Sequence, residues 1–381
     1  MNILFLNNDY KLGGLQRVSS VIGNELSVRN KIYFYSLIDN TNFYGVSNFY
    51  CTYPRYNGFF KFKVKAFKSF RIIEQTINND HEYKPHRYIG HELDKLKNFI
   101  VKNNIDRVIV SGPDLISCIP ELKKNLKTVN FIAWIHNNYN VYKNKYAKKF
   151  WKSFCSGIQQ SDKIICLTNE DYKLFKYLNQ KVALIYNPLT IDNTENVSLK
   201  KKNISFSGRI SYEHKGIDYL LKVASKLPEG WTISVAGGGS FREVRRLIKD
   251  IKKQGLENKL IYMGALNSEE LKKHYKNSSI FILTSRWEGF GLVVPEAMSY
   301  GLPIISFEQI GAREILNEGE YGILIENGNV EKLSNSLHQL IENFELREKY
   351  SKQSLKRVHC FNIENIINSW YSVLNVDEEN E

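Results

Sequence analysis

Short apolar runs alternate with amphipathic stretches along almost the whole chain, and this alternation limits the possible folds more than any other feature. Strands that alternate with helices pair in parallel, and helices then cover both faces of the sheet. The pattern therefore predicts an α/β fold of doubly wound parallel sheets. The predicted strands are residues 3–6, 32–37, 107–110, 129–134, 163–167, 182–186, 204–207, 232–236, 260–262, 280–283, 303–306 and 322–325.

A break in this pattern predicts two domains. At 381 residues the chain is longer than one usual core requires. The strand-poor stretch 190–202 is polar and ends in three lysines. We therefore predict a first domain over 1–188, a second over 189–360, and a C-terminal segment over 361–381 that begins as an amphipathic helix. Residues 38–88 do not fit the alternation and receive no assignment.

Composition narrows the class of protein. Hydrophobic residues make up 43% and charged residues 24%, which is typical of a globular protein. The N-terminus lacks a basic, apolar leader, and no apolar run approaches the ~18 residues of a spanning helix, so we predict a cytoplasmic location. Five scattered cysteines indicate reduced thiols rather than disulfides or a zinc site. The net charge of +13 leaves nucleic acid, anionic membrane and phosphorylated substrates open as partners.

The stretch 287–298 carries the clearest chemical signal. Glu288 and Glu296 lie on either side of a turn that contains Gly289 and Gly291, directly before a predicted helix. A helix N-terminus favours an anion, and glycines let the backbone approach a ligand closely. Carboxylates at both ends of such a turn can accept hydrogen bonds from hydroxyls, so the pattern fits a nucleotide diphosphate sugar. The alternative is an ordinary strand–turn–helix crossover with surface glutamates.

Two further strand ends carry polar or glycine-rich loops. Arg209 and Lys215 follow the first strand of the second domain, where a planar guanidinium and an ammonium can converge on one diphosphate. Their alternative interpretation is a pair of solvated cations in a basic protein. Gly13 and Gly14 follow the first strand of the chain, where paired glycines allow close approach to a phosphate or form a simple turn.

These strings together resemble the Glu-x7-Glu, Gly-Arg…Lys-Gly and Gly-Gly-x-x-Arg elements of family 4 retaining glycosyltransferases, the glycosyl transferases group 1 type. Gln16 departs from the pattern, because many members have Glu there. The resemblance implies the GT-B fold, in which two Rossmann-like domains face each other across a cleft and a C-terminal helix crosses back to the first, acceptor-side domain. It also implies transfer of a sugar from a nucleotide diphosphate sugar with retention at the anomeric carbon, with UDP as the default base.

The resemblance also implies roles for individual residues. Glu296 would bind ribose hydroxyls and Glu288 hydroxyls of the donor sugar. The chain has no Asp-x-Asp motif, so we expect no metal and no cofactor besides the donor substrate. The implied catalytic residues are the strand-end His136 with Glu288, Arg209 and Lys215. The implied donor site comprises Gly13, Gly14, Arg209, Lys215, Gly289, Phe290, Gly291, Leu292 and Glu296.

Two basic, aromatic stretches offer an explanation for the positive charge. Tyr142, Tyr146, Phe150 and Phe154 recur every four residues among lysines, and the run 59–70 is similar. Such a helix face can lie in an anionic membrane interface. The alternative is an aromatic stripe in the core with lysines in water. We predict membrane or acceptor contact through Lys61, Lys63, Lys145, Lys148 and Lys149.

The sequence thus predicts a hexosyltransferase-type enzyme that acts on a glycan acceptor, possibly lipid-linked, in bacterial surface polysaccharide or glycoconjugate biosynthesis. The enzyme would bind peripherally to the inner face of the cell membrane. Alternatives are a basic nucleic-acid-binding protein, a non-catalytic sugar-nucleotide-binding protein, and a sugar-nucleotide epimerase of the same fold. The chain lacks a recognised nucleic-acid module, so nucleic acid is not an expected partner.

Overall fold

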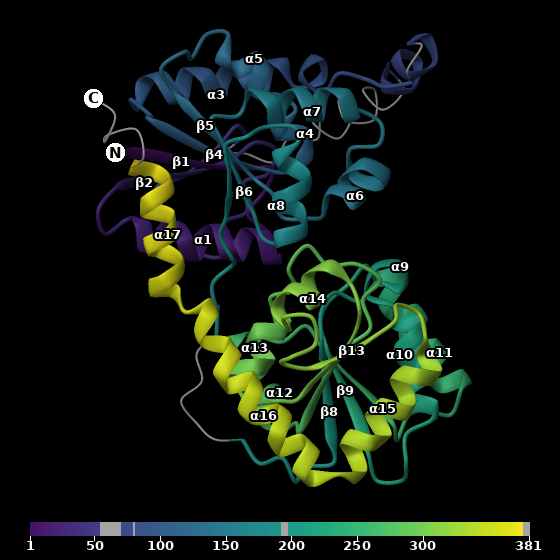
Figure 1. Ribbon diagram of the computed structural model, residues 1–381. Helices are drawn as coiled ribbons and strands as arrows, with labels where there is room; N and C mark the ends of the chain where they lie inside the picture. Colours follow the sequence, from purple (N-terminus) through teal and green to yellow (C-terminus); the bar gives the residue numbers. More distant parts are fainter. Residues whose placement is uncertain (54–69, 79–80, 192–196, 376–381) are drawn as a thin grey trace. The chain divides into compact units, whose positions relative to one another are not determined.

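The computed structural model describes residues 1–53, 70–78, 81–191 and 197–375. The chain divides into two compact units (Figure 1). Unit 1 comprises Met1–Tyr186 together with Ile366–Glu381, and unit 2 comprises Asn187–Asn365. The division after Tyr186 lies close to the boundary predicted after residue 188.

Unit 1 is built on a parallel sheet of seven strands among the described residues, in the order β3-β2-β1-β4-β5-β6-β7. The strands are β1 (Asn2–Asn7), β2 (Lys31–Ser36), β3 (Phe49–Cys51), β4 (Arg107–Ser111), β5 (Asn130–Trp134), β6 (Lys163–Cys166) and β7 (Val182–Leu184). The helices are α1 (Gly14–Leu26), η1 (Pro85–Tyr88), α3 (Gly90–Lys102), α4 (Pro113–Ile116), α5 (Ile119–Lys123), α6 (Tyr139–Val141), η2 (Tyr142–Tyr146), α7 (Trp151–Gln160) and α8 (Asn169–Lys176).

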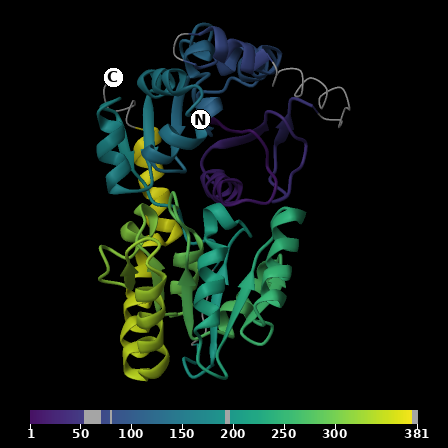
Figure 2. The ribbon, with the colours of Figure 1, turned by 90° about the vertical axis from the view of Figure 1, so that its right-hand side faces the viewer.

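The last helix of the described chain, α17 (Ile363–Asn375), begins in unit 2 and packs its later residues into unit 1. The fully buried Trp370 lies 4.8 Å from Trp134 and 6.4 Å from Phe5, measured between ring centroids. The buried Arg107 donates hydrogen bonds to the Leu374 carbonyl from Nη2 at 3.1 Å and from Nε at 3.3 Å. The helix therefore completes the core beside β1 and β4, and Figure 2 shows its end, in yellow, among the elements of unit 1.

Unit 2 is built on a six-stranded parallel sheet in the order β10-β9-β8-β11-β12-β13, counted over its described residues. Its strands are β8 (Asn203–Ser207), β9 (Thr232–Ala236), β10 (Leu260–Gly264), β11 (Ile280–Leu283), β12 (Ile304–Phe307) and β13 (Ile323–Ile325). Its helices are α9 (Tyr212–Lys215), α10 (Ile217–Ser225), α11 (Phe241–Lys253), α12 (Ser268–Lys276), α13 (Val293–Ser299), α14 (Ile310–Ile315), α15 (Val330–Glu342), α16 (Phe344–Val358) and η3 (His359–Phe361).

The strand order explains where each unit can bind a ligand. The first strand of each unit, β1 or β8, is central, and the order reverses on either side of it. Crossover loops diverge at such a switch point and leave room at the carboxyl ends of the strands. The central strands β8 and β11 are mostly buried, and the polar residues that follow them lie at this edge of the sheet.

The predicted doubly wound α/β fold is confirmed, because each predicted strand forms and all pair in parallel. The sequence missed the edge strand β3, which lies in the stretch 38–88 that received no assignment. All five cysteines are free. None of the helices in the described part of the chain combines the length and apolar content that crossing a bilayer requires.

Of the two interpretations of the aromatic residues 142–154, the structure supports the stripe in the core rather than the membrane-facing stripe. Tyr142, Phe150 and Phe154 are buried in the core of unit 1, where the Phe154 ring stacks on Tyr142 at 5.1 Å. The segment also folds as the π-helical turn η2 followed by α7 rather than as one helix. The apolar surface of the rings is satisfied inside the protein, as the alternative interpretation held.

The neighbouring lysines Lys145, Lys148 and Lys149 are exposed. Lys61 and Lys63 lie outside the described residues.

Candidate active site

The loops that follow β8 and β11 are locked together at the edge of the unit 2 sheet. The buried Thr284 donates a hydrogen bond from Oγ1 to the Lys215 carbonyl at 2.9 Å. Gly216 follows with φ +63°, and a Cβ there would lie 2.1 Å from the Thr284 carbonyl oxygen. Only glycine permits both this backbone conformation and this close approach. The two loops that carry Lys215 and Glu288 therefore have a fixed separation.

Glu288 is the centre of a buried polar cluster and is only 6% exposed. Its Oε1 accepts a hydrogen bond from Ser285 Oγ at 2.6 Å and forms an ion pair with Lys215. Its Oε2 lies 3.8 Å from His214 Nε2. Burial opposes the charge of Glu288, but the attraction of Lys215 and the hydrogen bonds outweigh burial, so the pKa of Glu288 is lowered. Glu288 is therefore a fixed carboxylate at neutral pH.

His214 supports the turn that carries Glu288. Its ring stacks on Trp287 with 4.7 Å between centroids, and its Nε2 donates to the Trp287 carbonyl at 2.9 Å. Burial lowers the pKa of His214, which keeps the ring neutral near pH 7. The neutral ring positions Trp287 without adding a second charge beside Lys215.

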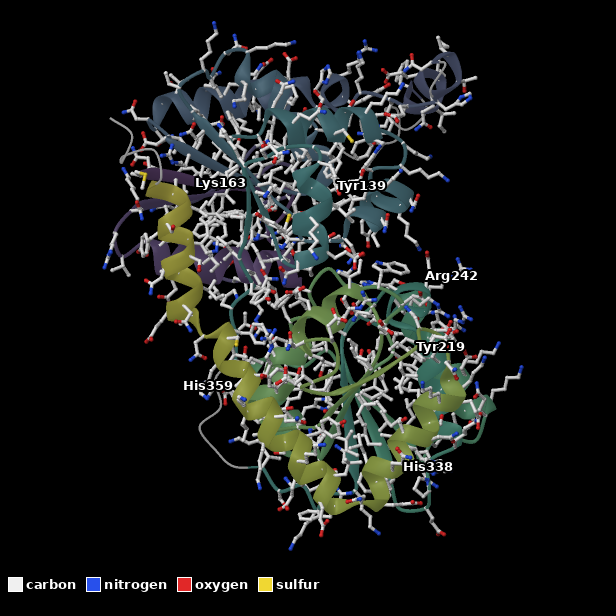
Figure 3. All side chains as sticks on the ribbon, viewed as in Figure 1. Tyr139, Lys163, Tyr219, Arg242, His338 and His359 are labelled. Carbon is white, nitrogen blue, oxygen red and sulfur yellow. The ribbon has the colours of Figure 1, made fainter. Side chains whose placement is uncertain are left out.

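Arg286 fixes the same turn from the other side. Its guanidinium makes two hydrogen bonds to Asp218, at 3.0 Å and 2.7 Å, and lies 4.0 Å from the ring centroid of Tyr219. Both partners belong to α10, where Figure 3 labels Tyr219. These contacts tie the turn that carries Arg286 to α10.

Glu296, in the first turns of α13, is almost fully buried at 1% exposure. Thr190 Oγ1 donates to its Oε1 at 2.6 Å, and the Tyr275 hydroxyl donates to its Oε2 at 3.1 Å. A carboxylate oxygen can accept more than one hydrogen bond, so these contacts orient the group and leave it able to accept others.

The turn from Gly289 to Leu292 packs closely against α14. Gly291 has φ +94°, which favours glycine, and the Phe290 side chain is buried. A Cβ on Gly311 would lie 2.4 Å from the Phe290 carbonyl oxygen. The position of this turn therefore depends on the absence of a side chain at 311.

Arg209, by contrast, is exposed and has no hydrogen bond or ion pair among the described residues. It follows β8 through Gly208, whose φ is +155°. The adjacent Gly237 passes so close that a Cβ on it would lie 1.8 Å from the Gly208 carbonyl oxygen. The loop that presents Arg209 is thus held by backbone packing while its guanidinium remains available to a ligand.

In unit 1, the predicted glycines lie at the start of α1. Gly13 exchanges hydrogen bonds with the Tyr44 hydroxyl, which accepts from its N–H at 3.2 Å and donates to its carbonyl at 2.9 Å. Gln16, the residue that departs from the family pattern, donates from Nε2 to Asp9 Oδ1 at 2.9 Å. A glutamate could not donate this bond, so the local network is built for an amide.

His136 follows β5 and lines a cavity of about 440 Å³ that lies entirely in unit 1. Its Nε2 is 3.4 Å from Ser111 Oγ, and its ring packs against Trp134 at 4.3 Å. Burial lowers the pKa of His136 to about 3, so the ring is neutral at physiological pH. The cavity is lined by Leu15, Arg71, Tyr83, Pro85, Ile89, Gly112, Pro113, Asp114, His136, Asn137, Tyr142, Tyr146 and Phe150.

The structure thus places the predicted residues in two groups. Unit 2 holds Arg209, Lys215, Glu288, Glu296 and the turn Gly289–Leu292, and joins Lys215 directly to Glu288. Unit 1 holds Gly13, Gly14 and His136.

Sequence reasoning missed several supporting residues. Ser285 and His214 lie next to the predicted motif residues in the sequence, and this position could have indicated a supporting role. Nothing in the sequence indicated Thr190 and Tyr275, because they lie 106 and 21 residues away from Glu296 along the chain.

Comparison with known proteins agrees with this geometry. Residues 190–357 match the family model for glycosyl transferases group 1. An uncharacterised glycosyltransferase of Haemophilus influenzae is 31% identical over 291 residues, which cover 74% of this chain and 79% of that protein. The amylovoran biosynthesis glycosyltransferase AmsD of Erwinia amylovora is 24% identical over 95% of this chain and 96% of its own length.

The solved structure of HepE from Anabaena in complex with UDP and glucose has a similar fold. The TM-score is 0.77 at 16% identity, over 99% of this chain and 100% of that one. Two Rossmann-like α/β units are the architecture of GT-B glycosyltransferases. The chain therefore belongs to the glycosyl transferases group 1 family and is a glycosyltransferase with the GT-B fold.

Proposed function

We propose that this glycosyltransferase moves a sugar from a nucleotide diphosphate sugar, with UDP as the base, to a glycan acceptor with retention at the anomeric carbon. One observation carries the proposal. The buried carboxylate Glu288 is ion-paired with Lys215 at the carboxyl ends of β8 and β11. Buried charges of opposite sign in a rigid loop pair are the arrangement that an anionic donor with hydroxyl groups requires.

Arg209 and Lys215 would bind the donor diphosphate. As the glycosidic bond breaks, negative charge grows on the departing diphosphate oxygen, and fixed cations stabilise that charge without reorganising. Lys215 is held by Glu288, and the backbone of Arg209 is held by the close approach of Gly208 and Gly237. We propose that transfer needs no metal, because these two cations with the backbone N–H groups near Gly291 and Leu292 supply the positive charge.

The two glutamates would bind hydroxyl groups at opposite ends of the donor. Glu288 would accept from hydroxyls of the transferred sugar, and Glu296 from the ribose. Thr190 and Tyr275 fix the plane of the Glu296 carboxylate, so the acceptor atoms are oriented before the donor arrives. Gly13, Gly14 and His136 would contribute from unit 1, where a neutral His136 can exchange hydrogen bonds without repelling a cation-like sugar.

No residue of the motifs is an evident covalent nucleophile. We therefore propose that the acceptor attacks from the face on which the diphosphate departs, through an oxocarbenium-like state, and that the departing phosphate takes the acceptor proton. Both substituents then share one face of the sugar, which retains the anomeric configuration.

The proposed setting is bacterial surface polysaccharide or glycoconjugate biosynthesis, with a lipid-linked acceptor. The role of the Erwinia relative in amylovoran biosynthesis and the UDP and glucose bound to HepE support this setting and the choice of UDP. The exposed Lys145, Lys148 and Lys149 support peripheral contact with the anionic cytoplasmic face of a membrane, by charge alone.

A thermal-shift screen of the purified protein against UDP-, GDP- and ADP-sugars tests the donor proposal. A ligand that binds only the folded state raises Tm, so the UDP-sugars should raise it most. Release of UDP in the presence of EDTA tests metal independence, and NMR of the product tests retention. A Tm that is unchanged by all the nucleotide sugars, without nucleotide release, would refute the donor assignment.

Vesicle co-sedimentation tests the membrane proposal separately. Vesicles with anionic lipid should retain the wild-type protein at low salt and retain less of the Lys145→Gln/Lys148→Gln/Lys149→Gln variant. Equal retention of both proteins would show that these lysines do not contact the bilayer.

A further inference from the structure

The cavity of unit 1 that His136 lines has a chemical character of its own. Its volume of about 440 Å³ falls in the range of pockets that bind small organic ligands, roughly 300–1,000 Å³. Tyr83, Tyr142, Tyr146 and Phe150 supply aromatic walls. Aromatic walls with a few polar groups are suited to a ring that has an apolar C–H face and polar edges.

Two polar atoms of this lining are buried without a hydrogen-bond partner among the described residues. One is Arg71 Nε, which can only donate, and the other is Asn137 Oδ1, which can only accept. A buried polar atom without a partner costs about 1–3 kcal/mol, so a ligand that satisfies both gains affinity. A hydroxyl group can do so, because it both donates and accepts. A phosphate or carboxylate only accepts, so it would leave Asn137 Oδ1 unsatisfied.

The charge in the cavity also disfavours an anion. The Arg71 guanidinium lies 5.1 Å from the ring centroids of both Tyr83 and Tyr88, which hold it in place. The Asp114 carboxyl, which accepts hydrogen bonds from Asn8 Nδ2 at 3.0 Å and 2.9 Å, opposes the charge of Arg71 in the same cavity. Burial raises the pKa of Asp114, while Arg71 favours its ionised form. The lining therefore offers an anion no net positive charge.

We infer that this cavity binds an uncharged pyranose ring, the terminal sugar of the acceptor glycan, and that it discriminates against acidic sugars and polyol phosphates. The assignment of the bound sugar as acceptor rests on the proposed transferase function. The ring would stack on the aromatic wall that includes Tyr146, while its hydroxyls would donate to Asn137 and accept from Arg71. The cavity thus selects the class of acceptor by hydroxyl pattern and charge.

Binding of simple glycosides to the full-length protein tests this inference. Saturation-transfer NMR and titration would compare methyl β-D-glucopyranoside and methyl β-D-galactopyranoside with methyl β-D-glucuronide and sn-glycerol 1-phosphate. We expect at least one neutral pyranoside to bind more tightly than either anion. Tyr146→Ala and Asn137→Leu should each weaken that binding about tenfold, through loss of stacking or of a hydroxyl partner.

The matched control is Tyr177→Ala, since Tyr177 is an 86% exposed tyrosine of unit 1 outside the cavity lining. Tyr146 is itself 43% exposed, so its loss should leave Tm unchanged. Tighter binding of an anion, or wild-type affinity in both cavity variants, would overturn the inference.

The UDP thermal shift, and nucleotide release measured without an acceptor, report on the donor site and should be unchanged in the cavity variants. A wild-type protein that gives these signals but shows no preference for a neutral pyranoside over the anions refutes the cavity assignment alone. Absence of both signals in the wild-type protein refutes the donor proposal instead.

Discussion

At the scale of single residues, the site combines two carboxylates that are fixed by hydrogen bonds or ion pairs with one arginine that has no such contact among the described residues. Glu288 and Glu296 are buried, and each has at least two side-chain partners, whereas Arg209 is exposed and unpaired within the described residues. Substitutions of these residues should therefore differ in their effect on stability even where they affect the same reaction.

Arg209→Ala should lower kcat/KM for transfer by about 10²–10³ while leaving Tm within experimental error. The loss follows from removing one fixed positive group that faces the diphosphate. The unchanged Tm follows because the guanidinium makes no hydrogen bond or ion pair with the described residues. Steady-state kinetics and calorimetry measure the two quantities, and Arg245→Ala, an exposed arginine of α11, serves as control. Near-wild-type turnover in Arg209→Ala would contradict the proposed role.

Glu296→Ala should abolish most transfer and leave the protein folded. Thr190 and Tyr275 lose their acceptor, so a moderate fall in Tm should accompany the loss of activity. Glu296→Gln keeps the shape and should regain stability without regaining the affinity for UDP. Full UDP affinity in both variants, measured by titration calorimetry, would rule out contact with the nucleotide.

At the scale of elements, the glycine contacts set the spacing of the loops. Gly311→Ala would place a methyl group 2.4 Å from the Phe290 carbonyl, so the turn before α13 must move. A displacement of about 1 Å in a catalytic loop can cost about 10² in rate. We expect such a loss in kcat, while Gly90→Ala, whose added Cβ meets no atom within 4 Å, should be neutral. Equal kcat values for the two variants would show that the turn tolerates the shift.

The fold was predictable at this scale because strands such as β6 and β11 are largely apolar runs that alternate with amphipathic helices. The strand β3 was not, since three half-exposed residues within a Tyr- and Asn-rich stretch leave no periodic signal. The sequence alone indicated the Glu-x7-Glu string and the Arg209–Lys215 pair as candidate site residues, because their side chains suit hydroxyl groups and a diphosphate. It did not indicate the tertiary partners of Glu296, because Thr190 and Tyr275 reach it only through the folded chain.

Helix α12 carries a titrating group that should make unit 2 sensitive to acid. Burial lowers the pKa of His274 to about 4, below its ordinary value of about 6.5. Below about pH 6.5 the unfolded chain binds a proton that the folded state excludes, so stability falls as pH falls toward 4, by about 1.4 kcal/mol per pH unit. His274→Asn should flatten this slope in denaturant titrations at pH 4.5–7. Parallel slopes in wild type and variant would exclude His274 as the source.

At the scale of the whole molecule, α17 links the stability of unit 1 to the end of the chain. Trp370→Ala would open a cavity beside Trp134 and Phe5 and should cost about 3–5 kcal/mol in the unfolding free energy of unit 1. Ser372→Ala, at an exposed position of the same helix, should cost little. Calorimetry that resolves the two units should show the loss in unit 1, and an unchanged transition there would contradict the packing role of α17.

Unit 1 is discontinuous in sequence, because it combines Met1–Tyr186 with Ile366–Glu381, and this has a consequence for biosynthesis. Multidomain chains commonly fold in the order in which they leave the ribosome. Here the nascent chain delivers every residue of unit 2 before Trp370 has been translated, while the first-made half of the protein still lacks part of its interior. Unit 1 therefore cannot complete its core until the final codons are translated, and a message truncated after Asn365 would yield all of unit 2 joined to a unit 1 that lacks part of its core.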